Sequence, residues 1–144
     1  MPAQPDAQPQ IMGLPPGQRV HPTVLIVEDE RISRRALAYL LERSGFEPAA
    51  CESAEEALQQ LGTDPPPPVV LVDVDLPGMS GLELITRLEK LRPGLLAVLI
   101  TAAAGECIDR FRRSHDVQYL RKPLDFPRLL KLLDERLVST GKPH

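Results

Sequence analysis

An unbroken apolar run that leads into an acidic residue is the feature that most constrains the fold of this chain. Residues 69–72 are all valine or leucine, Asp73 follows directly, and a turn containing Pro77 and Gly78 comes next. A run rich in β-branched residues, without alternation, is typical of a strand covered on both faces, as in a parallel sheet. Asp73 would then lie at the carboxyl end of the strand, where open α/β sheets bind their ligands. A carboxylate there can act as a nucleophile, a metal ligand or a polar cap.

Apolar runs alternate with segments of helical spacing along most of the chain. The predicted strands are residues 24–27, 46–51, 69–72, 95–100 and 117–120. The predicted helices are residues 32–44, the segments that begin after Ser53 and after Ser80, and residues 105–114 and 125–139. This alternation predicts an α/β fold with a doubly wound parallel sheet. Pro48 cannot donate to a sheet ladder, which places the second strand at an edge and favours the flavodoxin-like (βα)5 strand order 2-1-3-4-5.

Length and composition favour one soluble domain. A chain of 144 residues with an apolar fraction of 42% is ordinary for a single domain with a core. The net charge of −3 is too small to indicate a nucleic-acid surface, and no apolar run approaches the roughly 20 residues that cross a bilayer. Cys51 and Cys107 lie far apart without a CxxC motif, which favours a reducing, cytoplasmic location over a disulfide framework or a zinc site.

Both ends of the chain are predicted to lie outside the folded domain. Residues 1–22 are rich in proline and glutamine and bury too little apolar area to offset the entropy of ordering, so a disordered tail is expected. The folded domain is expected to span residues 23–139, and residues 140–144 are expected to form a second, short tail.

Polar side chains follow four of the predicted strands at the points where the strands end. Glu28 and Asp29 follow the first strand, Asp73 the third, Thr101 the fourth and Lys122 the fifth. In the order 2-1-3-4-5 these four ends are adjacent, so the side chains are expected to meet at one edge of the sheet. Three carboxylates in one place repel one another unless a cation joins them, and oxygen-only ligands suit Mg²⁺ or Mn²⁺.

This group of side chains has the composition of a phosphoryl-transfer site. Lys122 and Thr101 can bind an anionic oxygen, and a divalent cation can neutralise charge on a transferring phosphoryl group. Asp73 can accept that group as an acyl phosphate. Each residue by itself would be an ordinary turn, cap or surface residue, so the interpretation depends on their meeting at one place.

Four motifs resemble those of the receiver domain of bacterial two-component response regulators. They are Val24–Glu30 with its acidic pair, Val72–Gly81 around the acceptor aspartate, Leu99–Ala102, and Tyr119–Pro123. The resemblance covers residues 23 to about 139, with the motifs in the family's order. Glu28 stands where the family more often has aspartate. The resemblance also implies that the Lys122–Pro123 peptide bond is cis.

The resemblance implies a role for each matched residue. Asp73 would accept a phosphoryl group from a phosphohistidine of a sensor histidine kinase. Mg²⁺ or Mn²⁺ would be held by Glu28, Asp29, Asp73 and the backbone carbonyl of Asp75. Thr101 and Lys122 would contact the phosphoryl oxygens, and Tyr119 would be the aromatic switch residue that turns inward when Thr101 moves.

The expected function is that of a single-domain, chemotaxis-regulator-like response regulator and not of an enzyme. Because few residues follow Thr140, the signal is expected to leave through the face formed by residues 105–139. That face would contact a downstream protein or a histidine phosphotransfer protein, with no nucleic acid or membrane as partner. One alternative is a pseudo-receiver that binds partners without being phosphorylated. A second alternative is a haloacid-dehalogenase-type phosphatase, because Asp73-Val74-Asp75 resembles the DxD motif of that family. Two features do not fit it: that motif follows the first strand of the fold, whereas Asp73 follows the third, and Pro77 occupies the motif's fifth position, where that family has threonine or valine.

Overall fold

Five parallel strands form one sheet in the order β2-β1-β3-β4-β5, as the sequence predicts. The structure is a computed structural model, and it describes residues 22–62, 66–76, 78–102, 109–111 and 117–141. The strands are β1 (Thr23–Val27), β2 (Glu47–Cys51), β3 (Val69–Asp73), β4 (Leu96–Thr101) and β5 (Gln118–Arg121). The helices are α1 (Arg31–Arg43), α2 (Ala54–Gln60), α3 (Gly81–Leu91) and α5 (Phe126–Gly141). The doubly wound α/β fold is therefore confirmed.

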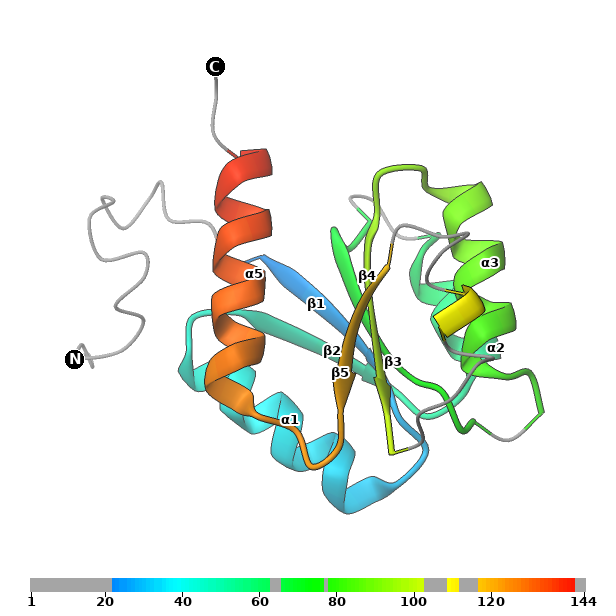
Figure 1. Cartoon of the computed structure of the whole chain (residues 1–144), viewed down its shortest axis with the longest axis horizontal. Coiled ribbons are helices and arrows are strands. Elements are labelled where there is room, and N and C mark those ends of the chain that lie inside the picture. Colours follow the sequence, from blue (N-terminus) through cyan, green and yellow to red (C-terminus); the bar gives the residue numbers. More distant parts are fainter. Residues whose placement is uncertain (1–21, 63–65, 77, 103–108, 112–116, 142–144) are drawn as a thin grey trace.

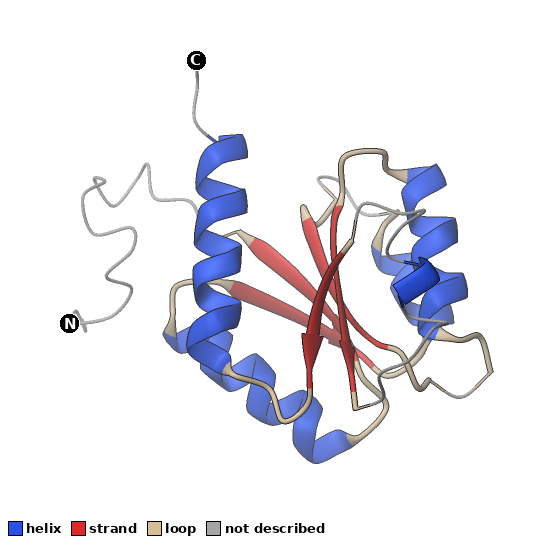
Figure 2. Cartoon of the chain, viewed as in Figure 1, coloured by secondary structure: helices blue, strands red, loops and turns tan. Residues whose placement is uncertain are grey.

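Helices cover both faces of the sheet. In Figures 1 and 2, α1 and α5 lie against one face, and α2 and α3 lie against the other. The residues of β3 alternate between these two layers: Val69 and Leu71 pack toward α1 and α5, whereas Val70 and Val72 pack toward α2 and α3. Because both faces are covered, every residue of β3 is buried, which accounts for the non-alternating apolar run.

The predicted helix starts agree with the observed caps. Ser53 Oγ accepts a hydrogen bond from the backbone N–H of Glu56, and Ser80 Oγ accepts one from the backbone N–H of Glu83. An Asp125 carboxylate oxygen accepts from the N–H of Arg128 at the start of α5. Each of these bonds satisfies a backbone donor that the first turn of a helix leaves without a partner.

Two sequence predictions extend beyond the described residues. Of the helix predicted at residues 105–114, the structure describes residues 109–111, which are helical. The predicted tails fall mostly on residues 1–21 and 142–144, which also lie outside the described residues. At the carboxyl end of the folded domain, α5 continues to Gly141, past the end predicted at residue 139.

Within the described ranges, none of the helices combines the length and apolarity needed to span a bilayer.

The start of α3 packs directly on the end of β3. The backbone N–H of Gly81 donates to the carbonyl of Val74 at 3.1 Å. A Cβ atom at Gly81 would lie only 2.5 Å from the carbonyl oxygen of Asp73 and 2.9 Å from a methyl group of Val72. Only glycine therefore fits here without a shift. This close approach helps to hold the backbone on which Asp73 is carried.

Candidate functional site

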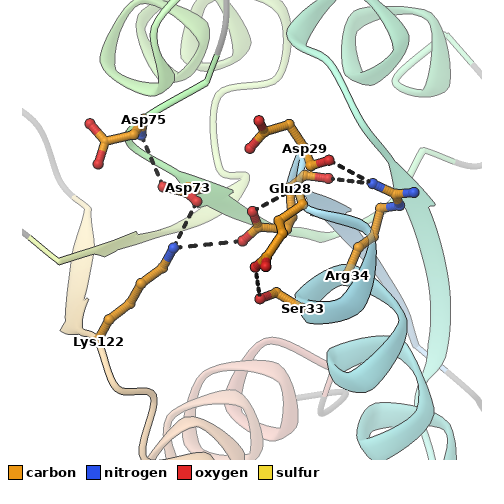
Figure 3. Close-up of polar contacts among 8 residues, drawn as sticks. Glu28, Asp29, Ser33, Arg34, Asp73, Asp75 and Lys122 are labelled. Carbon is orange, nitrogen blue, oxygen red and sulfur yellow. Dashed lines mark hydrogen bonds and ion pairs between the residues drawn. The ribbon is translucent and has the colours of Figure 1, made fainter.

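The carboxyl ends of β1, β3 and β5 bring four charged side chains together, as Figure 3 shows. Val27 of β1 pairs with Val72 of β3, so Glu28, the next residue, lies beside Asp73. Lys122 follows the last residue of β5 and reaches the same place from the other side. The parallel strand order thus places together residues that are distant in the sequence, as predicted.

Three carboxylates form a cluster with the composition of a hard-cation site. One oxygen from each of Glu28, Asp29 and Asp73 lies within 4.8 Å of the other two. Glu28 and Asp73 are buried, and Asp29 is exposed. Oxygen-only ligands with one side open to water fit Mg²⁺ or Mn²⁺ better than a softer metal. The donor set therefore fits the cation that the sequence predicts.

Both oxygens of the Asp73 carboxylate have a hydrogen-bond donor. The backbone N–H of Asp75 donates to Oδ1 at 2.9 Å, and the Lys122 ammonium lies 2.8 Å from Oδ2. The same ammonium lies 3.8 Å from Oε1 of Glu28. Lys122 therefore bridges the two buried carboxylates, and its charge offsets part of their mutual repulsion.

Burial and charge shift the protonation of this cluster. Burial, followed by the nearby charge of Asp73, raises the pKa of Glu28 to about 7, although the N–H of Glu30 and the charge of Lys122 act in the opposite direction. Burial lowers the pKa of Lys122, but the hydrogen bond and charge of Asp73, together with the charges of Glu28 and Asp75, outweigh it and leave that pKa above its usual value. Such a site is short of positive charge, which a divalent cation would supply.

The remaining predicted residues lie at the end of β4, within β5 and just past the end of β3. Thr101 is fully buried at the end of β4, and its carbonyl accepts from the N–H of Lys122 at 2.8 Å. Tyr119 is half-buried on β5 and packs against the core under α2 and α3. The carboxylate of Asp75 is exposed and points away from Asp73 (Figure 3), so only the backbone of Asp75 faces the cluster. The Lys122–Pro123 bond is cis, as the resemblance implied.

Sequence reasoning missed Arg34, which binds the backbone of the acidic pair Glu28 and Asp29. Its Nη1 donates to the carbonyl oxygens of Glu28 at 2.9 Å and Asp29 at 3.2 Å. The available signal was an arginine in the first turn of a helix that begins just after an acidic strand end. Arginine at a helix surface is common, so this signal does not identify a backbone contact.

Comparisons with known proteins agree with this geometry. Residues 24–134 match the family described as the response regulator receiver domain. The polar-differentiation response regulator DivK of Brucella ovis is 34% identical over 80% of this chain and 95% of its own length. The phosphate regulon transcriptional regulatory protein PhoB of Escherichia coli is 36% identical over 69% of this chain. This chain spans only 44% of PhoB, and 29% of a Thermotoga maritima cyclic di-GMP phosphodiesterase to which it is 35% identical.

Solved structures give the same result. A CheY-like receiver domain protein from Methanospirillum hungatei superposes with a TM-score of 0.77 at 28% identity, covering 85% of this chain and 98% of that one. The response regulator TrrA of Thermotoga maritima, solved in complex with Mg(2+)-BeF, superposes with a TM-score of 0.71 at 28% identity, covering 80% and 98%. The fold, the acidic edge and the matched residues agree: this chain belongs to the receiver domain family of response regulators.

Proposed function

We propose that Asp73 is the phosphoacceptor of this receiver domain and that Glu28, Asp29 and the backbone carbonyl of Asp75 join it in holding Mg²⁺. The observation that carries the proposal is the position of the Asp73 carboxylate. It lies 2.8 Å from the Lys122 ammonium and within the acidic cluster. The Mg²⁺–beryllofluoride complex of TrrA, a relative of the same fold, supports this choice of cation.

The proposed reaction moves one phosphoryl group from nitrogen to oxygen. A carboxylate oxygen of Asp73 attacks the phosphorus of a phosphohistidine on a sensor histidine kinase. The new P–O bond forms as the P–N bond breaks, and the imidazole leaves with the electron pair and takes up a proton from water. A bound divalent cation neutralises charge on the phosphoryl oxygens.

The residues of the chain each contribute a separate effect. The N–H of Asp75 and the ammonium of Lys122 orient the carboxylate before reaction, since each donates to a different oxygen. Lys122 then transfers its interaction to a phosphoryl oxygen, and the Thr101 hydroxyl donates to another. Hydrolysis of the acyl phosphate restores Asp73, so the chemistry is that of a signalling acceptor and not of an enzyme with a separate substrate.

Phosphorylation signals only if it favours one of two conformations. Thr101 and Tyr119 are the proposed switch residues, since they lie on the neighbouring strands β4 and β5 beside the site. The face of residues 105–139 is the proposed reporting surface, with a downstream protein or a histidine phosphotransfer protein as partner. The cytoplasmic location predicted from the sequence belongs to the same proposal.

Phosphorylation by a small donor tests the proposal directly. The purified chain is incubated with phosphoramidate and Mg²⁺, and the intact mass is measured with and without a chelator. The expected result is one added phosphoryl group that requires the cation and is absent in Asp73→Asn. A chain that folds and binds Mg²⁺ but is never modified would instead act as a pseudo-receiver. Continuous turnover of a small phosphomonoester would favour the phosphatase alternative.

A further inference from the structure

The loop that carries the acidic pair is closed by contacts within residues 28–34. The backbone N–H of Glu30 donates to Oε2 of Glu28 at 3.1 Å, and the N–H of Arg34 donates to the carbonyl of Glu30 at 2.9 Å. The hydroxyl of Ser33 donates to a carboxylate oxygen of Glu30. Arg34 adds the contact that spans the pair, because its single Nη1 donates to two consecutive carbonyl oxygens.

This contact has a consequence for where the two carboxylates point. Successive side chains of an extended strand point to opposite faces of the sheet. A straight continuation of β1 would therefore send the carboxylates of Glu28 and Asp29 to opposite sides. The turn avoids this outcome, since oxygens of both carboxylates lie within 4.8 Å of one another and of Asp73. Arg34 lies on the far side of the pair from Asp73 (Figure 3), so its guanidinium holds the backbone without occupying the cluster.

We propose that Arg34 is a positioning residue for the divalent-cation site. Its guanidinium fixes the turn at residues 28–29 and so keeps both carboxylates directed at Asp73. The inference rests on the proposed function only in that the acidic cluster binds a divalent cation. It assigns to Arg34 a role in metal affinity that acts through the backbone of Glu28 and Asp29.

Positioning and simple charge predict opposite changes when Arg34 is removed. A cation close to a metal site repels the metal, so loss of the charge alone would tighten Mg²⁺ binding. Loss of a group that orients metal ligands weakens metal binding, typically by about tenfold or more. The direction of the change therefore distinguishes the two roles.

The chain offers a matched control for charge. Arg35 is the next residue of α1, it is exposed, and it has no polar contact within the described part of the chain. Arg35→Met removes one positive charge from the same helix turn without touching the loop. Arg34→Met removes the charge and both hydrogen bonds, while its unbranched apolar side chain replaces the aliphatic stem of the arginine. Arg34→Lys keeps the charge but has a shorter reach and lacks the planar donor group.

The experiment measures Mn²⁺ binding by electron paramagnetic resonance and Mg²⁺ binding by calorimetry on the full chain and the three variants. Circular dichroism in chelator confirms that each variant is folded. We expect Arg34→Met to weaken binding of both ions by about tenfold. Arg34→Lys should fall between it and the wild type, and Arg35→Met should bind as tightly as the wild type or slightly more tightly.

Kinetics separate positioning from a general structural defect. With phosphoramidate as donor, the Mg²⁺ concentration for half-maximal phosphorylation should rise about tenfold in Arg34→Met, whereas the rate at saturating Mg²⁺ should return to the wild-type rate. If Arg34→Met does not fold, weakened binding in folded Arg34→Lys supports the same conclusion, because charge alone predicts no change there.

Three outcomes would overturn the inference. Unchanged or tighter metal binding in folded Arg34 variants would show that Arg34 affects the metal only through its charge and does not position the ligands. Equal weakening in Arg35→Met, which removes none of these hydrogen bonds, would show that the loss of metal affinity does not come from the contacts of Arg34 with the turn. A wild-type chain that binds neither ion would overturn the proposed function itself and the inference with it, so the two failures are distinguishable.

Discussion

The ammonium of Lys122 lies 2.8 Å from Oδ2 of Asp73, although 49 positions separate the two residues in the sequence. Lys122 also reaches Oε1 of Glu28 at 3.8 Å. One cation thus lies between the two buried carboxylates of the site. In the proposed mechanism, the same position would let Lys122 stabilise the cluster before phosphorylation and bind a phosphoryl oxygen after it.

Asp73→Asn should abolish phosphorylation by phosphoramidate, because an amide oxygen is a far weaker nucleophile than a carboxylate oxygen. Intact-mass spectrometry in the presence of Mg²⁺ measures the result. Glu55→Gln, the same acid-to-amide change at an exposed position of α2, should accept the phosphoryl group at the wild-type rate. Modification of Asp73→Asn at that rate would place the acceptor elsewhere.

Lys122→Met should change metal binding and phosphorylation in opposite directions. Removing a cation from the cluster strengthens its attraction for Mg²⁺, so calorimetry should show tighter binding. The maximal phosphorylation rate should fall by roughly 100-fold to 1000-fold, the usual cost of losing one donor to a developing charge. Lys90→Met, at an exposed position of α3, controls for loss of a lysine. A variant that reacts at full rate would remove Lys122 from the proposed mechanism.

The raised pKa of Glu28 predicts a pH dependence of stability in the metal-free protein. Burial raises this pKa from 4.5 to about 7, so between these values the folded state binds more protons than the unfolded state. The contribution of Glu28 is then fully present below pH 4.5 and is lost as the pH rises through about 7. The free energy of unfolding should fall by roughly 1–3 kcal/mol across this range.

Urea unfolding in chelator at several pH values measures this slope. Glu28→Gln should flatten it, because the amide does not titrate, whereas the exposed Glu55→Gln should leave it unchanged. Mg²⁺ affinity should rise over the same range, since the cation competes with the proton on Glu28. A stability that increases with pH between these values would contradict the assigned protonation.

Gly81→Ala should destabilise the fold and disturb the site together. The added Cβ would lie 2.5 Å from the carbonyl oxygen of Asp73, so the backbone of β3 or α3 must shift, at a cost of about 1–3 kcal/mol. Gly94→Ala provides a control, because its φ of +99° strains any side chain but no atom lies within 4 Å of the added Cβ. It should cost about 1 kcal/mol without slowing phosphorylation. Equal phosphorylation rates in both variants would show that Gly81 does not position Asp73.

The central strands were predictable because both of their faces are buried against helices, so nearly all of their residues are apolar. The apolar runs of β1, β3 and β4 reflect burial on both faces, and Pro48 correctly identified β2 as an edge strand. The meeting of the site residues was predictable because each of them lies at or just after the end of a strand. A parallel topology brings such strand ends to one edge of the sheet. The reporting helix at 105–114 was predicted from weaker spacing, and most of it lies outside the described residues.

The support of the site was not predictable in the same way. The contact of Arg34 depends on the path of the turn between β1 and α1, and the fit of Gly81 against Asp73 depends on how closely α3 approaches β3. Neither relationship leaves a periodic signal, because each joins one side chain or one missing Cβ to a backbone carbonyl.

By itself, the sequence determined the order of the elements, the faces they bury and the chemical types that reach the edge of the sheet, since hydrophobic period and strand-end position are local properties. Only the tertiary structure decided which oxygens meet which donors: Lys122 between Asp73 and Glu28, the N–H of Asp75 on Asp73, and Arg34 behind the acidic pair. The physical reason is distance, because hydrogen bonds and ion pairs act over a few ångström, and that scale is set only when the strands and helices are packed together.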